Sequence, residues 1–99
     1  MLSQTHVYIT GDVINVGMRA WVSIQAKLLH VNGWVRNVFD KPEVFGSQGG
    51  VEAVFQGEKQ HVDKLVELVQ KGSDIARVEY VESLEQTPTE VFEKFEIRR

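Results

Sequence analysis

The hydrophobic pattern changes period along the chain, and each change predicts a different element. Apolar and polar residues alternate along residues 6–13, which predicts a strand with one buried face. A loop follows at 14–18, and from Arg19 the apolar positions take helical spacing. The four that share one face of this predicted helix are Trp21, Ile24, Leu28 and Val31. We expect Asn32 and Gly33 to end the helix, because both residue types tolerate left-handed backbone.

The rest of the chain repeats these two patterns. The predicted elements are strands at 34–39, 51–55, 75–84 and 92–98 and a second helix from about 58 to 71. We expect Phe95 and Ile97 to point inward from the last strand. With right-handed crossovers, this order predicts an α+β fold, a ferredoxin-like split βαβ sandwich with a C-terminal strand added. Its antiparallel sheet carries two helices on one face, and residues 1–99 are expected to form a single domain.

Composition narrows the classes of function. The chain has 99 residues, of which 42% are hydrophobic and 25% charged, and it has no cysteine. Disulfide scaffolds, thiol nucleophiles and thiolate zinc sites are therefore excluded. The net charge of −3 argues against DNA or anionic lipid as partners. No apolar run approaches the length of a membrane span and no signal peptide is evident, so we expect a cytoplasmic protein.

The charge is unevenly distributed, which directs the search for a site. Residues 1–42 carry four cations and two anions, whereas residues 43–99 carry seven cations and twelve anions. An anion-binding site is therefore to be sought in the first half. The three histidines, at positions 6, 30 and 61, lack partners at metal-ligand spacing and are interpreted as surface residues.

The junction at residues 11–19 is the strongest candidate for chemistry. A loop that runs into a helix start presents free backbone N–H groups and the positive end of the helix dipole, and both favour an anion. Gly17 and Asn15 tolerate the positive φ that such a loop needs, and Arg19 can bind a phosphoryl group through two N–H donors. Spacing alone does not distinguish this site from a structural loop.

Two motifs carry a resemblance to a known family. Residues 11–19 read G-D-V-I-N-V-G-M-R, which resembles the acylphosphatase signature G-x-V-Q-G-V-G-F-R. Residues 33–40, G-W-V-R-N-V-F-D, resemble the second motif of that family, G-W-V-R-N-x-x-D-G. The resemblance extends from about His6 to Arg98, and the two motifs are spaced as the family spaces them.

The resemblance implies an acylphosphate phosphohydrolase that needs no metal and no cofactor. It implies Arg19 and Asn37 as catalytic residues, with Asn37 positioning the attacking water. The residues implied to bind substrate are Ile14, Asn15, Val16, Gly17, Met18 and Arg19. The substrate would be a small acyl phosphate and inorganic phosphate a product, with no nucleic acid or membrane partner, and we expect a monomer.

Several departures leave alternatives open. Ile14, Asn15 and Met18 stand where the family has Gln, Gly and Phe, so a second hypothesis is a slow or inactive member that only binds phosphate. The connection at 41–50 is longer than in the family. It is either a surface insertion or a flap that brings Phe45 or Lys41 near Asn37. A third hypothesis, a nucleic-acid-binding domain, lacks the basic aromatic sheet face that it would need.

Overall fold

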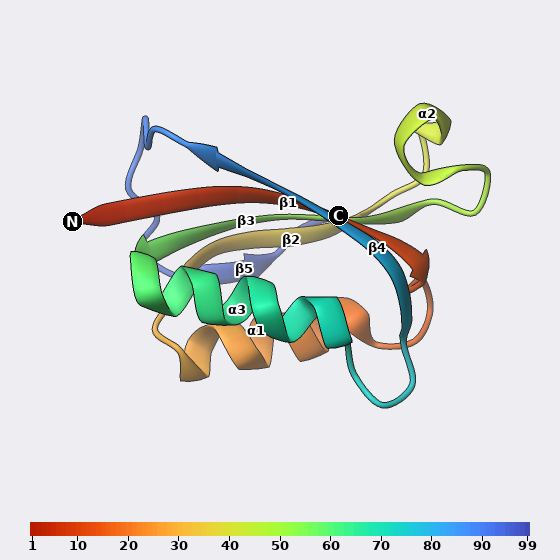
Figure 1. Ribbon diagram of the computed structural model, residues 1–99, viewed down its shortest axis with the longest axis horizontal. Coiled ribbons are helices and arrows are strands. Elements are labelled where there is room, and N and C mark those ends of the chain that lie inside the picture. The colour runs from red at the N-terminus through yellow and green to blue at the C-terminus, as the bar shows by residue number, and fades with distance from the viewer.

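The computed structural model describes residues 1–99 and arranges them as a five-stranded sheet with two long helices on one face (Figure 1). The prediction of an α+β, ferredoxin-like fold is confirmed. In chain order the elements are β1 (Leu2–Asp12), α1 (Met18–Leu28), β2 (Asn32–Val38), α2 (Pro42–Phe45), β3 (Gly50–Glu58), α3 (Lys59–Lys71), β4 (Arg77–Gln86) and β5 (Phe95–Ile97).

The directions of the strands determine which strand ends lie at the same edge of the sheet. The sheet order is β4-β1-β3-β2-β5. β3 pairs antiparallel with both β1 and β2, and β5 pairs parallel with β2. As a consequence β1, β2 and β5 all run in one direction and end at the same edge of the sheet. This edge also receives the start of α1, which follows β1 through a short loop.

The core lies between the sheet and the helices α1 and α3. The predicted alternation of the first strand is confirmed, because Val7, Ile9 and Val13 are all buried. Burial of these apolar side chains is the main stabilisation of such a two-layer arrangement. The core cluster is Val7, Ile9, Val13, Met18, Val22, Ala26, Val31, Val35, Val51, Ala53, Phe55, Val62, Leu65, Val69 and Phe95.

The face of α1 that packs on the sheet differs from the predicted one. The buried residues of the helix are Met18, Val22, Ser23 and Ala26. Ile24 and Leu28 are 57% and 70% exposed, and Val31 is buried but lies beyond the helix end. The helix begins at Met18 with that side chain in the core, which sets its rotation. The small Ser23 and Ala26 then let the helix approach the sheet closely. The prediction that Ile24 and Leu28 mark the core-facing stripe is therefore wrong.

The end of α1 also departs from the prediction. His30 adopts the left-handed conformation, with φ of 57°. Asn32 and Gly33 are already the first residues of β2, so they do not end the helix. Gly33 has φ of 134°, and a Cβ at this position would overlap the carbonyl oxygen of Val54 on the neighbouring strand. The glycine is therefore required by close strand pairing rather than by a helix stop.

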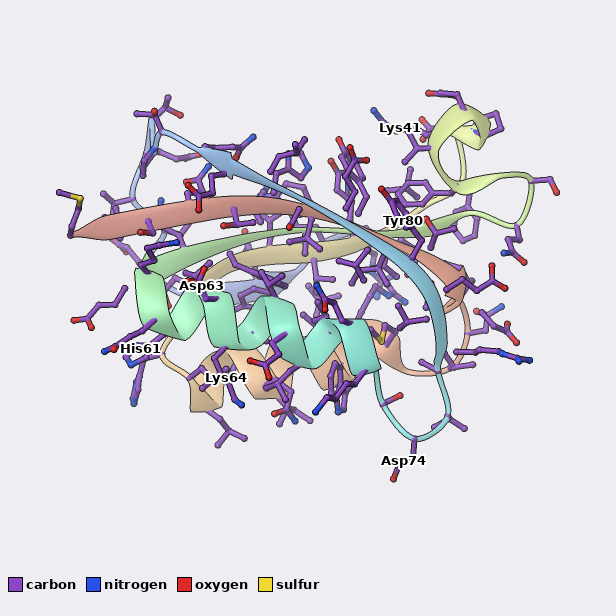
Figure 2. All side chains as sticks on the ribbon, in the orientation of Figure 1. Lys41, His61, Asp63, Lys64, Asp74 and Tyr80 are labelled. Atoms are coloured by element: carbon purple, nitrogen blue, oxygen red, sulfur yellow. The ribbon has the colours of Figure 1, made fainter.

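The connection at 41–50 contains α2, which lies on the sheet face opposite α1 and α3 (Figure 1). Phe45 is buried there, with its ring centroid 5.7 Å from that of Tyr8. Its ring also fills the space left free above Gly50. Lys41 lies on the same side of the sheet as α2 (Figure 2). The flap hypothesis is wrong, because Phe45 and Lys41 are separated by the sheet from the layer that holds α1.

The last strand is only partly covered. Phe95 is buried as predicted, whereas Ile97 lies on the same face of the sheet but is 46% exposed, so it points toward the helical layer without being buried. β5 is an edge strand of three residues, and its C-terminal end lies beside the first turn of α1. There Ile97 borders an open cavity whose other lining residues are Gly17, Arg19, Ala20 and Arg99, so no large apolar side chain covers it.

An ion-pair cluster connects three strands on the face opposite the helices. The buried carboxylate of Glu52 accepts a hydrogen bond from Arg36 Nε at 2.7 Å and lies 2.6 Å from His6 Nε2. Burial by itself raises the pKa of Glu52, but the bonds from Arg36 and His6 outweigh it and hold that pKa below its ordinary value. Arg36 and Glu52 are register partners, so the cluster fixes β2 against β3 directly beside Asn37.

We expect Glu52→Gln to lower the free energy of unfolding at pH 7 by about 2 kcal/mol, because Arg36 loses the negative charge of its partner and an NH2 group that cannot accept replaces one carboxylate oxygen. A carboxyl group with a lowered pKa stabilises the fold above its unfolded-state pKa. This contribution disappears as the pH falls through the folded-state pKa. The difference between wild type and Glu52→Gln should therefore shrink below about pH 4. Urea unfolding from pH 2 to 7 measures it, and parallel curves for the two proteins would contradict the assignment.

Candidate active site

The loop between β1 and α1 is held by apolar side chains and shaped by two left-handed residues. Ile14 and Val16 are partly buried and pack against the core. Between and after them, Asn15 and Gly17 have φ of 63° and 76°. Alternation of negative and positive φ turns successive N–H groups toward one concave side, which is how backbone loops bind anions. The loop at 14–17 thus has the backbone shape of an anion cradle, with its side chains used as anchors.

The start of α1 adds to this cradle. Gly17 occupies the N-cap position, and no side chain donates or accepts a capping hydrogen bond there. The first turn of α1 also holds no acidic residue. The leading N–H groups of the helix are therefore not satisfied by a local carboxylate or hydroxyl. They remain free, together with the positive end of the helix dipole, to bind an anion.

Two arginines line a cavity beside the helix start. The cavity has a volume of about 340 Å³ and is lined by Gly17, Arg19, Ala20, Ile97 and Arg99. The ion pairs of the protein involve neither Arg19 nor Arg99. Their guanidinium groups thus add positive charge to the helix start in a chain whose net charge is −3. The arrangement favours an anion with several oxygens, since each guanidinium presents a planar set of donors.

Asn37 lies at the same edge of the sheet. Ile9 and Asn37 both pair with Val51, one from each side of β3. Ile9 and Val51 belong to the core on the helix side, so register places Asn37 on that side too. Its side chain is half-buried and makes no hydrogen bond to another protein group. Val35 pairs with Ile97, and two residues further along these parallel strands are Asn37 and Arg99.

The structure separates the predicted site residues into groups. Gly17 and Arg19 share the cavity beside β5, whereas Asn37 is not part of its lining and only shares its edge of the sheet. The side chain of Met18 is buried in the core, so this residue can contribute only its backbone N–H. Asn15 is exposed.

The sequence interpretation missed Arg99. The signal for it was the pairing of the last strand with the motif that contains Asn37, and this pairing is visible only once the strand order is known. Arg36, by contrast, pairs with Glu52, and His6 is held by the same carboxylate rather than being a free surface residue.

The fold and this edge define a ferredoxin-like domain whose first strand and first helix are joined by a loop with the backbone shape of an anion cradle. Comparison with known proteins identifies the family to which this domain is similar. The family model described as Acylphosphatase matches residues 5–97. No helix of the chain has the length and apolarity needed to span a membrane.

Individual relatives agree with the family model. The chain is 38% identical to an acylphosphatase of Syntrophus aciditrophicus (strain SB), over 98% of this chain and 93% of the relative. It is 40% identical to one of Syntrophobacter fumaroxidans, over 95% and 89%. The solved structure of an acylphosphatase from Coxiella burnetii superposes with a TM-score of 0.85 at 31% identity, covering 98% and 93% of the two chains. This chain belongs to the acylphosphatase family.

Inorganic phosphate should raise the melting temperature of the wild-type protein, because a ligand that binds only the native state stabilises it. At phosphate concentrations about a hundredfold above the dissociation constant, the expected stabilisation is about 2.7 kcal/mol. Arg19→Gln should remove most of it. Lys64→Gln deletes a positive charge on the exposed side of α3 and should leave the protection unchanged (Figure 2). Thermal unfolding at constant ionic strength measures the effect, and equal protection of both variants would rule out Arg19 as a phosphate ligand.

Proposed function

We propose that the chain hydrolyses the carboxyl–phosphate bond of small acyl phosphates, giving a carboxylate and inorganic phosphate. Arg19 and Asn37 are the catalytic residues of this proposal. The backbone of Ile14, Asn15, Val16, Gly17 and Met18 binds the substrate together with Arg19. The observation that carries it is the common direction of β1 and β2. This direction brings the loop, the helix start and Asn37 to one edge of the sheet.

The phosphoryl group is bound by donors that are already in place. Positive φ at Asn15 and Gly17 shapes the loop, and the first turn of α1 supplies further N–H groups. Arg19 binds the equatorial oxygens from the side of β5. Phosphoryl transfer passes through a loose transition state whose charge is spread over these oxygens, so fixed donors stabilise it without rearranging.

The attacking water is oriented by Asn37. Its amide has no protein partner, so its oxygen is available to accept a hydrogen bond from water. An amide is a very weak base, and its contribution is therefore placement rather than proton removal. Water attacks phosphorus in line with the bond to the acyl oxygen, and the proton of the water passes to solvent or to a phosphate oxygen.

The leaving group needs no catalytic group of its own from the protein. When the bond between phosphorus and the acyl oxygen breaks, its electron pair stays on a carboxylate. The conjugate acid of that carboxylate has a pKa near those of aspartic and glutamic acid. Such a group leaves at neutral pH without being protonated, so no general acid is needed. The short list of two catalytic side chains and a backbone loop is therefore chemically sufficient.

The context of this activity is part of the proposal. Residues 1–99 would act as a single acylphosphatase-like domain, monomeric and cytoplasmic, with a small acyl phosphate as its partner. The apolar core lies within one chain and supports a monomer. Sedimentation over a hundredfold range of concentration measures the oligomeric state.

Wild-type protein should hydrolyse benzoyl phosphate in the presence of EDTA, and both Arg19→Gln and Asn37→Ala should lower kcat/KM at least about a hundredfold. Gln70→Ala changes an exposed amide on α3, away from the site, and serves as the matched control for Asn37→Ala. Circular dichroism confirms that each variant is folded. A loss below tenfold in either catalytic variant would contradict the role given to that residue.

The departure at position 15 gives a separate test. Asn15 holds φ of 63°, a conformation that glycine adopts without strain. Asn15→Gly should therefore preserve or raise the turnover of benzoyl phosphate. If folded wild-type protein binds phosphate but hydrolyses nothing and Asn15→Gly restores turnover, the Cβ of Asn15 blocks the cradle. If Asn15→Gly also fails to hydrolyse benzoyl phosphate, the result would instead favour the alternative of a phosphate-binding module.

A further inference from the structure

A second cavity begins at the loop of residues 14–17, which the proposed function makes the phosphate loop. It runs along the outside of the helical layer. It has a volume of about 660 Å³ and lies between α1, the end of α3 and the turn that leads to β4. The turn is marked by Asp74 below the end of α3 in Figure 2. The hydrophobic residues of its lining are Val16, Ala20, Trp21, Ile24, Leu68 and Ile75.

This groove is continuous with the cavity that holds Arg19. Gly17 and Ala20 line both of them, so the two cavities meet across the first turn of α1. Gly17 has no side chain to separate them, and Val16 brings the phosphate loop itself to the groove wall. A molecule held at the loop by its phosphate therefore has an apolar surface within reach on one side and guanidinium groups on the other.

Two apolar residues of the groove, Ile24 and Ile75, are not used by the core. Ile24 is 57% exposed and Ile75 is 75% exposed. Trp21 and Ile24, from the first half of the stripe that periodicity predicted to face the core, thus form one wall of this groove. Exposed apolar surface that borders a polar site is typical of ligand recognition.

We propose that this groove binds the acyl group of the substrate and selects acyl phosphates with an apolar chain or ring. The inference rests on the proposed hydrolysis and deepens it. An acyl phosphate has a charged head and a carbon tail, which matches a cationic loop that opens into an apolar groove. The one ionisable group in the lining is Asp74, whose carboxylate repels a second negative charge on the acyl group. Between Gly17 and Ile24 the helix rises roughly 10 Å, enough for a chain of several carbons.

The test compares straight-chain substrates of increasing length. The groove is open to solvent, so each added methylene is about half buried and should raise kcat/KM about twofold. We expect hexanoyl phosphate to exceed acetyl phosphate at least about tenfold in the wild type. Ile24→Asn should reduce this ratio at least about threefold while leaving acetyl phosphate hydrolysis within twofold. Leu28→Asn is the matched control, because Leu28 is exposed on the same helix but lies outside the groove.

The outcomes separate the two levels of the proposal. If folded wild-type protein hydrolyses none of the acyl phosphates in the series, from acetyl to hexanoyl phosphate, the proposed function is overturned, and this inference with it. Hydrolysis whose kcat/KM is the same for acetyl, butyryl and hexanoyl phosphate would overturn only the acyl groove. A chain-length effect reduced equally by Ile24→Asn and Leu28→Asn would also overturn it. The acyl groove would also be overturned if chain length has no effect and the wild type forms a dimer that Ile24→Asn abolishes. A second copy of the chain would then occupy the groove.

Discussion

The central strand β3 runs antiparallel to both of its neighbours, and the candidate site depends on this arrangement. It forces β1 and β2 to point the same way, so the loop after β1 and Asn37 near the end of β2 share one edge. The parallel pairing of β5 with β2 adds Arg99 to that edge. Groups from three distant parts of the sequence are thus brought together by backbone pairing rather than by contacts among themselves.

The ion-pair cluster and the core fix this arrangement from the two faces of the sheet. On one face, the paired residues Arg36 and Glu52 resist slippage of β2 against β3, and His6 ties in β1. On the other, Val51 lies between Ile9 and Asn37 and is fully buried. A shift of one residue in register would exchange the two faces, moving Asn37 away from the helices and burying Arg36. The register that stabilises the sheet is therefore the same register that places Asn37 at the site.

Most of the fold was predictable from the sequence, because strand alternation and the order of elements follow local patterns. The wrong predictions have one cause. The spacing of apolar residues within an element does not show how that element packs against its neighbours. Ile24 and Leu28 fit a helical stripe, but the core selected the smaller Ser23 and Ala26 for close approach. Ile97 alternates correctly with Phe95 yet remains exposed, because it borders a cavity that no large apolar side chain fills.

For the site, the loop, Gly17 and Arg19 were predictable from their residue types, and Asn37 entered only through the resemblance to the family. The sequence did not reveal Arg99, since a parallel strand at the sheet edge leaves no local signal. Nor did it reveal that the side chain of Met18 is withdrawn into the core. Side chains that anchor a loop and side chains that face its ligand have similar patterns in a sequence. Only the three-dimensional arrangement separates them.

The strand order also determines when the site comes into existence. β1 pairs with β4 across large sequence separations, such as Gln4 with Gln86, and β5 joins β2 from the far side. Pairings of this kind form slowly, because a long loop must close before any contact stabilises it. During synthesis on the ribosome, the phosphate loop is made early but has no finished sheet edge beside it until β4 and β5 have emerged. The candidate site is therefore complete only after the last strand has been made, because Arg99 reaches it through the pairing of β5 with β2.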